Sequence, residues 1–248
     1  MIMGQTGPEF YDNDAVFSTY MSGRDRRVDS PNEVLEKPVI DDLVGRLDGL
    51  RILDLGCGDA RYGQEALEKG CHSYLGIDGS RNMIELANKQ LAGTPGTAIR
   101  STIEEWAYPH ELFDLVISRL ALHYVEDITA VFGKVFGALE VNGRFIFSVE
   151  HPVITSCDRA WQKGGPRQDW IVDDYFETGP RHTLWMGGEV LKYHRTVEDY
   201  FTALRWVGFV VDSVRESRPN REQFTDLTTY ERRKRIPLML FFSAHRPL

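Results

Sequence analysis

Three absences bound the function of this 248-residue sequence. It has only three cysteines, Cys57, Cys71 and Cys157, whose odd number and spacing favour neither a disulfide framework nor a metal site. It has no apolar run near the roughly 20 residues that a membrane-spanning helix needs, and its N-terminus lacks the pattern of a signal peptide. We therefore expect a cytoplasmic protein that does not enter a membrane and holds no metal.

An excess of positive charge is also missing. The formal net charge is −8 at pH 7, whereas binding to a phosphate backbone requires a basic face. The one basic run, Glu231-Arg232-Arg233-Lys234-Arg235, is more typical of a solvated helix end than of an RNA contact. The charge balance therefore disfavours nucleic acid as a partner.

The composition, 42% hydrophobic and 27% charged, is that of one large globular domain. Hydrophobic periodicity divides it into four parts. Residues 1–47 form an N-terminal lid of two helices, and 48–150 form a core in which strands alternate with helices. Residues 151–195 are an aromatic-rich cap insertion, and 196–248 give a C-terminal helix and two strands. An α/β fold follows from this alternation.

The stretch over residues 51–63, Arg-Ile-Leu-Asp-Leu-Gly-Cys-Gly-Asp-Ala-Arg-Tyr-Gly, organises the core. An apolar strand interrupted only by Asp54 leads into a turn at Gly56 and Gly58. Asp59 then stands where the cap of the next helix is expected. A strand, a glycine turn and a helix in this order predict the nucleotide-binding corner of a doubly wound sheet.

The charges around the turn indicate which cofactor it holds. A dinucleotide-binding turn has a third glycine where this sequence has Arg61. Asp54 and Asp59 flank the turn and would repel a pyrophosphate, but they would attract an ammonium or a sulfonium. A cofactor with an adenosine, no phosphate and a cationic end fits these charges, and this describes S-adenosylmethionine.

Over roughly residues 45–150 the sequence resembles the class I S-adenosylmethionine-dependent methyltransferases. The motifs are Leu53-Asp54-Leu55-Gly56-Cys57-Gly58, then Tyr74-Leu75-Gly76-Ile77-Asp78-Gly79-Ser80, then Phe113-Asp114-Leu115-Val116-Ile117-Ser118 followed by Leu122-His123-Tyr124-Val125-Glu126-Asp127. The segment from Ser148-Val149-Glu150-His151-Pro152 through Lys192-Tyr193-His194-Arg195-Thr196 is similar to bacterial methyltransferases without an assigned substrate. The resemblance implies a Rossmann-like, doubly wound seven-stranded sheet whose last strand is antiparallel. It also implies S-adenosylhomocysteine as the product of the cofactor.

The cofactor contacts follow from these motifs. Asp78 lies about twenty residues beyond the glycine turn, where an acid accepts hydrogen bonds from both ribose hydroxyls, and Gly79 follows it. Thr102 and Ile103 leave the third strand, so we expect them beside the adenine. Thr102 stands where family members commonly have an acid. Ser118 ends the fourth strand at the same edge of the sheet.

The N-terminal lid is expected to cover this edge. It would bring Tyr20 or Arg24 to the carboxylate of the cofactor's methionine. The alternative is a solvated arm that is held only by Phe17 and Tyr20.

Methyl transfer requires an oriented nucleophile and, for many acceptors, a general base. Ligands bind outside the carboxyl ends of the strands, so we consider His151, His123 and Glu150 as catalytic candidates. His151 is the first choice as base because an acid precedes it. His123 is the second, with packing or cofactor contact as the alternative. Glu150 is the candidate that pairs with a cationic acceptor instead.

The sequence thus predicts a methyltransferase that acts on N or O of a small-molecule acceptor, which the cap over residues 151–195 would select. Two alternatives stay open. One is a tRNA- or rRNA-modifying methyltransferase, disfavoured by the acidity and by the absence of an Asn-Pro-Pro-Tyr-type motif. The other is a protein that binds S-adenosylmethionine without catalysis. Monomer and homodimer are both compatible with the sequence.

Overall fold

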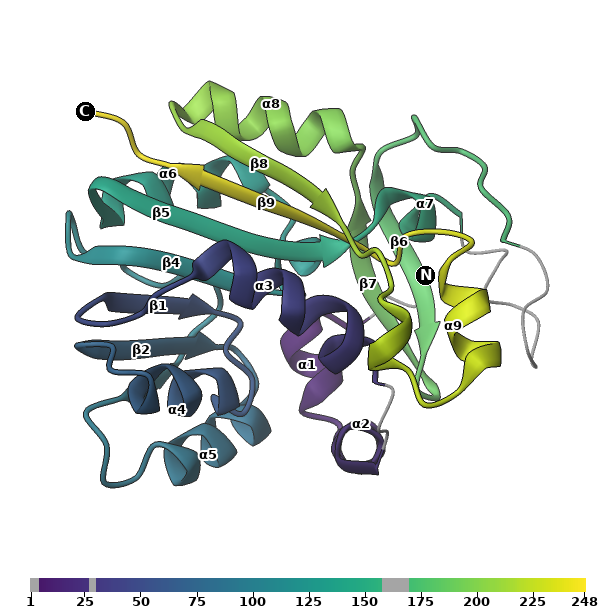
Figure 1. Ribbon diagram of the computed structural model, residues 1–248, viewed down its shortest axis with the longest axis horizontal. Helices are drawn as coiled ribbons and strands as arrows, with labels where there is room; N and C mark the ends of the chain where they lie inside the picture. The colour runs from purple at the N-terminus through teal and green to yellow at the C-terminus, as the bar shows by residue number, and fades with distance from the viewer. Residues whose placement is uncertain (1–4, 27–29, 158–169) are drawn as a thin grey trace.

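The computed structural model describes residues 5–26, 30–157 and 170–248 and is built around a seven-stranded sheet (Figure 1). The strand order is β3-β2-β1-β4-β5-β9-β8. The strands are β1 (Arg51–Leu55), β2 (Ser73–Asp78), β3 (Thr97–Arg100), β4 (Phe113–Arg119), β5 (Leu139–Glu150), β8 (Val210–Glu216) and β9 (Met239–His245). The first five strands pair in parallel, whereas β9 is antiparallel to β5 and β8. The predicted doubly wound sheet with an antiparallel last strand is confirmed.

Helices bury both faces of this sheet, which is why its central strands are almost wholly apolar. On one face, α3 (Lys37–Val44), α4 (Arg61–Glu68) and α5 (Arg81–Gln90) pack against side chains such as Ile52 and Ile117. On the other face, α6 (Ile128–Ala138) and α8 (Val197–Val207) pack against Leu53 and Val116. The core therefore lies in two layers, and the ligand site must lie at an end of the sheet.

Three helices begin at residues whose side chains cap them. Ser80 accepts a hydrogen bond from the Met83 N–H, Asp127 caps α6, and Thr196 forms a capping box with Asp199. The prediction for α4 is wrong, because its cap is Ala60 in a left-handed conformation with φ of 56°. Asp59 pairs instead with the Arg61 guanidinium at 3.0 Å.

The lid also differs from its prediction. The second of the two helices predicted for the lid begins as a π-helical turn, η1 (Asn32–Glu36), which continues into α3. Pro38 lies in the first turn of α3 and has no backbone N–H to donate. The change from π-helix to α-helix occurs at this point. Before these elements, α1 (Gly7–Tyr11) and α2 (Asp14–Arg26) cross the carboxyl end of the sheet (Figure 1).

The cap insertion contains α7 (Pro152–Thr155) and a hairpin of β6 (Gly179–Trp185) and β7 (Gly188–His194), which forms a separate two-stranded sheet. Residues 158–169, which include Trp161, lie outside the described residues. The hairpin meets the N-terminal segment, because the Leu191 N–H donates to the Gln5 carbonyl at 2.9 Å. The lid and the cap therefore form one continuous cover.

The remaining short elements are η2 (Leu122–Tyr124) after β4, and η4 (Arg221–Gln223) and α9 (Leu227–Arg233) between β8 and β9. Within the described part of the chain, no helix has the length and apolar character that crossing a membrane requires.

Candidate functional site

A cavity of about 1360 Å³ opens at the carboxyl end of the sheet. Its wall combines the glycine turn, the lid helices, the β6–β7 hairpin and the end of α9. Sites for one small ligand usually measure roughly 300–1,000 Å³. The cavity therefore has room for a cofactor and a second molecule side by side.

The glycine turn gives the cavity its close backbone approach. Gly56 has φ of +75°, and a Cβ there would lie 2.2 Å from the Cβ of Ala121. Gly58 has φ of +56°, and its N–H donates to Oδ2 of Asp78 at 2.9 Å. The left-handed conformation favours glycine at both positions, and Gly56 also has no room for a side chain.

Asp78 connects the turn to the next loop, since its Oδ1 accepts from the Ser80 N–H at 2.8 Å. Burial raises the pKa of Asp78 to about 6, although the two backbone N–H donors oppose this shift. The carboxylate thus lies in the cavity wall, partly deprived of solvent. Such a group gains from a ligand that donates hydrogen bonds to it.

Asp54 lies one layer behind the wall. It accepts a hydrogen bond from the Tyr74 hydroxyl at 2.7 Å, while its Oδ1 is buried without a partner among the described residues. Burial raises the pKa of Asp54 to about 7, against the opposing hydrogen bond from Tyr74. An orphaned carboxylate oxygen in this position favours a cationic group near the turn, and so the site fits S-adenosylmethionine.

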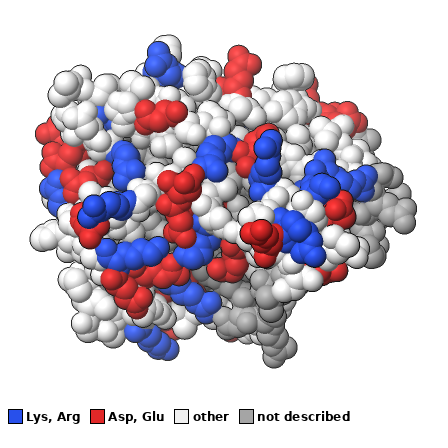
Figure 2. Space-filling model, viewed as in Figure 1, with Lys and Arg blue, Asp and Glu red and all other residues white. Residues whose placement is uncertain are grey.

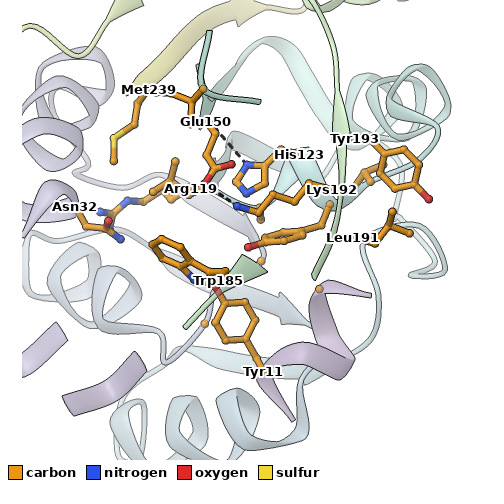
Figure 3. A pocket seen from close by; sticks show the side chains of 18 of the residues that line it. Tyr11, Asn32, Arg119, His123, Glu150, Trp185, Leu191, Lys192, Tyr193 and Met239 are labelled. Atoms are coloured by element: carbon orange, nitrogen blue, oxygen red, sulfur yellow. Dashed lines mark hydrogen bonds and ion pairs between the residues drawn. The ribbon is translucent and has the colours of Figure 1, made fainter. Parts of the chain in front are cut away.

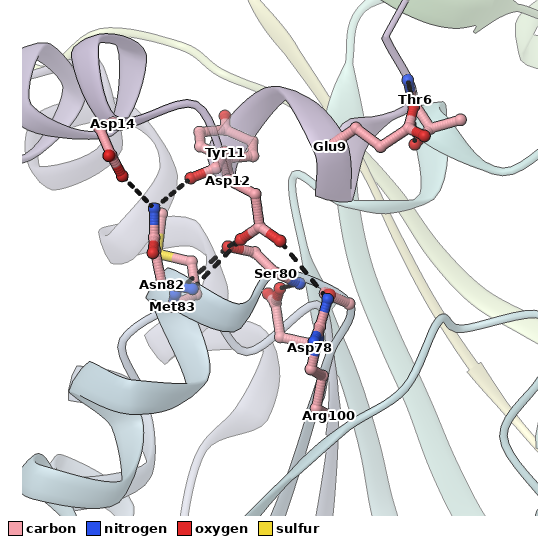
Figure 4. Close-up of polar contacts among 11 residues, drawn as sticks. Thr6, Glu9, Tyr11, Asp12, Asp14, Asp78, Ser80, Asn82, Met83 and Arg100 are labelled. Atoms are coloured by element: carbon pink, nitrogen blue, oxygen red, sulfur yellow. Dashed lines mark hydrogen bonds and ion pairs between the residues drawn. The ribbon is translucent and has the colours of Figure 1, made fainter.

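The lid is fastened to the loop that follows β2 (Figure 4). Oδ1 of Asp12 accepts from the Ser80 hydroxyl at 2.7 Å and from the Asn82 N–H at 3.2 Å. A Cβ on Gly79 would lie 2.6 Å from Cγ of Pro8. Helix α1 therefore rests directly on the loop that carries Asp78.

The opposite side of the cavity contains a buried ion pair (Figure 3). The Lys192 ammonium donates to Oε1 of Glu150 at 2.7 Å and lies 5.5 Å from the ring centre of Trp185 and 5.8 Å from that of Tyr124. Burial alone would raise the pKa of Glu150, but the Lys192 ammonium outweighs it and holds this pKa below its ordinary value. Glu150 is therefore ionised at neutral pH.

His123 lies beside this pair and is neutral. Burial lowers its pKa to about 4, while Glu150 opposes the shift. Its Nδ1 accepts from the Glu150 N–H at 3.4 Å. A long hydrogen bond of this kind orients the ring and leaves Nε2 as its other polar atom.

His151 is placed differently. Its Nδ1 accepts from the Val153 N–H at 3.2 Å as the cap of α7, and its Nε2 lies 3.0 Å from Oε1 of Glu216. Burial lowers the pKa of His151, with Glu216 opposing. Both ring nitrogens are therefore engaged within the chain, and His151 is not part of the cavity wall.

The structure thus sorts the predicted site residues into groups. Those in the cavity wall are Tyr20, Gly56, Gly58, Asp78, Gly79, Thr102, Ile103, His123 and Glu150. Asp54, Asp59 and Ser118 are buried behind it, and Ser118 donates to the Leu55 carbonyl at 2.7 Å. The side chain of Arg24, in α2, lies outside what the structure describes.

Lys192 was not among the predicted site residues, although the sequence carries a signal for it. Residues Val190, Lys192 and His194 alternate with more exposed neighbours along β7 and are buried. A lysine at an inward position of an alternating strand needs a partner, because a buried charge without one is costly. Finding Glu150 as that partner requires the tertiary structure.

Comparisons with known proteins agree with this geometry. A family model described as a methyltransferase domain matches residues 53–147. A solved putative S-adenosylmethionine-dependent methyltransferase from Listeria monocytogenes is 35% identical, with a TM-score of 0.79, over 86% of this chain and 97% of its own. One from Mesorhizobium loti is 36% identical, also with a TM-score of 0.79, over 90% and 99%. The chain belongs to the S-adenosylmethionine-dependent methyltransferases. An uncharacterised Haemophilus influenzae protein is 32% identical over 95% of this methyltransferase and 96% of its own length.

The family confirms the predicted cofactor, S-adenosylmethionine, whose sulfonium supplies an electrophilic methyl group when it is bound. In this methyltransferase the residues fit that role. Asp78 and the turn at Gly56 and Gly58 would hold the nucleoside, and the buried charge of Asp54 favours the cationic end. Which residues handle the acceptor is a separate question.

Proposed function

We propose that this methyltransferase acts on an N or O atom of a small-molecule acceptor, which binds in the same cavity beside Glu150. One observation carries the proposal. A single cavity joins the glycine turn to the Glu150–Lys192 pair under the cover formed by the lid and the hairpin. A covered site favours transfer to a small nucleophile, because it orients the reactants and limits water.

Glu150 is the residue that we assign to the acceptor. As an ionised carboxylate in the wall, it accepts a hydrogen bond from the N–H or O–H of the acceptor and takes the proton that this group loses. Lys192 holds one of its oxygens and keeps it ionised. His123 is neutral and adjacent, and because its Nδ1 accepts from the Glu150 N–H, its Nε2 carries the ring proton and suits a hydrogen bond to the acceptor rather than proton removal.

We place Glu150 before His151 in this role on geometric grounds. His151 caps α7 and pairs with Glu216, so its nitrogens are directed at partners other than a ligand. A general base must come within hydrogen-bond reach of the proton that it removes. Glu150 satisfies this requirement for a molecule in the cavity.

One observation favours the RNA alternative as a second candidate, because Arg232, Arg233 and Arg235 of the basic run line the cavity. We rank it lower. Six acidic residues also line the cavity, Asp78, Glu104, Glu105, Glu126, Asp127 and Glu150. Figure 2 shows Lys and Arg side chains interspersed with Asp and Glu on the face that it displays, whereas a phosphate backbone needs a continuous basic path.

Methyl-labelled S-adenosylmethionine tests the proposal directly. The protein is incubated with the label and either a small-metabolite extract or total tRNA, with Glu150→Gln as the matched inactive control. We expect label in the small-metabolite fraction. Label only in RNA would replace the proposal with the alternative, and label in neither fraction would favour binding without catalysis.

A further inference from the structure

We propose that the acceptor carries an anionic group, a carboxylate or a phosphate, which Arg232, Arg233 and Arg235 bind at the end of α9. This inference rests on the proposed function and specifies its substrate class. Arginine suits the role because its planar fork of donors matches both oxyanions and remains charged at any physiological pH.

The place of α9 in the fold is the first argument. Strands β8 and β9 are antiparallel neighbours, and a tight hairpin could join them. The chain instead inserts η4 and α9 between them and brings the end of α9 to the cavity. The insertion adds no strand to the sheet; it contributes Phe224 to the core and the end of α9 to the cavity wall.

The position of α9 is also held by packing. Phe224 is buried in the core beside α3 and α4, and Tyr230 packs against that cluster. Asp226 caps the helix by accepting from the N–H groups of Thr228 and Thr229 at 3.1 and 2.8 Å. The arginines therefore extend from a positioned helix rather than from a loose loop.

Charge divides between two sides of the cavity. Among the acidic wall residues, Glu104, Glu105, Glu126 and Asp127 follow β3 and β4, Asp78 ends β2, and Glu150 at the end of β5 is paired with Lys192. The three arginines come from α9 and the residues just after it. Arg119, the other arginine in the wall, is paired with Glu36 through its Nε at 3.1 Å from both carboxylate oxygens. The α9 end is thus the side of the wall that suits an anion.

The path from α9 to Glu150 sets the size of the acceptor. Met239 is also in the wall and lies opposite Glu150 in the β5–β9 pairing. Arg235 and Met239 are four positions apart in the sequence, a span of at most about 13–14 Å between their Cα atoms. A small metabolite can therefore place its anionic end at the arginines and its nucleophile at Glu150.

Equilibrium dialysis of the protein saturated with S-adenosylhomocysteine tests the inference apart from turnover. The probes are hydroxy- and amino-benzoates, the corresponding phenyl phosphates and the matching neutral benzamides. The test variant is Arg232→Ala/Arg233→Ala/Arg235→Ala. The matched control, Arg81→Ala/Lys89→Ala/Arg205→Ala, removes the same charge from exposed cations that do not line the cavity.

We expect the protein to retain carboxylates or phosphates at least tenfold more than the amides, with the two acid series showing which oxyanion is preferred. The test variant should lose this preference at least tenfold, and the control should keep it. Equal retention of the amides, or unchanged retention by the test variant, would overturn the inference. Retention of total tRNA alone, lost in the test variant, would overturn it in favour of RNA.

Labelled S-adenosylmethionine in place of S-adenosylhomocysteine separates the two proposals. Acids that are retained but never methylated would contradict the proposed function and leave the anion site in place. Methylation of the benzamides at the rate of the acids would support the proposed function and overturn the anion site.

Discussion

The two sides of the cavity are built in different ways. On the cofactor side, one continuous stretch, residues 51–80, supplies the turn and Asp78 through two strands and their loops, and Thr102 and Ile103 follow the next strand along the chain. The acceptor side combines the end of β5, the cap hairpin and α9, which are far apart in sequence. A site made from one supersecondary unit leaves a readable motif, whereas a site assembled from distant segments does not.

The two sides also treat charge differently. The acids of the cofactor side are raised in pKa by burial, Asp54 to about 7 and Asp78 to about 6, because no cation of the chain neutralises them fully. On the acceptor side Lys192 neutralises Glu150 and holds its pKa low. The cofactor side therefore favours a cationic ligand, whereas the acceptor side provides Glu150 as an ionised carboxylate.

The largest effect should come from the acceptor side. We expect Glu150→Gln to reduce kcat by about 10²–10⁴-fold, the usual contribution of a general base, while cofactor affinity measured by calorimetry stays near that of the wild type. Loss of cofactor binding together with turnover would mean that the two sides are not separable.

The variant needs a control for folding, because Lys192 loses its partner. An uncompensated buried charge costs about 3–5 kcal/mol of stability. Glu150→Gln/Lys192→Met removes both charges, so thermal stability should recover while turnover stays low. Recovery of turnover in the double variant would remove Glu150 from the mechanism.

On the cofactor side, Asp78→Ala should weaken S-adenosylmethionine binding by about 1.5–3 kcal/mol, the typical value of charge-assisted hydrogen bonds. The same change leaves the N–H groups of Gly58 and Ser80 without their acceptor. Asp78→Asn keeps an acceptor oxygen but no charge, so its affinity for S-adenosylmethionine should lie between those of the wild type and Asp78→Ala. Unchanged calorimetric affinity for Asp78→Ala would contradict the ribose assignment.

Cofactor affinity should depend on pH. Both Asp54 and Asp78 have pKa values above their ordinary range, so each gains a proton as the pH falls through about 7 and about 6. Protonation removes the negative charge that favours the cationic cofactor, and we expect affinity to fall about tenfold between pH 8 and pH 5. Asp54→Asn and Asp78→Asn should each reduce the pH dependence of cofactor affinity. An unchanged pH dependence in both variants would mean that other groups cause it.

The hydrogen bonds that join Asp12 of the lid to Ser80 and Asn82 should have a smaller effect on cofactor binding. Asp12→Ala removes the acceptor of Ser80 and Asn82, a loss of about 1 kcal/mol for neutral-donor hydrogen bonds. We expect cofactor dissociation to be a few-fold faster in stopped-flow measurements. Glu33→Ala, an exposed acid of η1, serves as the control. Equal rates of cofactor dissociation for both variants would show that the Asp12 hydrogen bonds do not retain the cofactor.

The sequence was sufficient for most of the fold and for much of the cofactor side. The α/β class follows from the alternation of apolar strands with amphipathic helices, and the seven-stranded sheet with an antiparallel last strand follows from the family resemblance. The turn, Asp78 and Gly79 are close in sequence or separated by one helix, and the structure places them together in the wall. Local chemistry determines such contacts.

The acceptor side could not be predicted from the sequence, because its contacts join residues that are far apart in the chain. Nothing near Glu150 in sequence shows that Lys192, in the cap hairpin, neutralises it. The basic run at 231–235 was interpreted as a solvated helix end, since only the tertiary structure brings α9 to the cavity. His151 was preferred as base because it neighbours an acid in sequence, yet Glu216 of β8 is its partner in space.

The smallest effect on turnover is expected for His151→Ala, which directly tests whether Glu150 rather than His151 is the base. Loss of the α7 cap should lower stability by about 1 kcal/mol, and the pair with Glu216 adds little because that carboxylate is 61% exposed. Turnover should change less than threefold, because neither ring nitrogen faces the cavity. His151→Asn, which retains a capping acceptor, should recover most of the stability. Collapse of turnover in His151→Ala at pH 7, with Glu150→Gln still active, would reverse the assignment of the base.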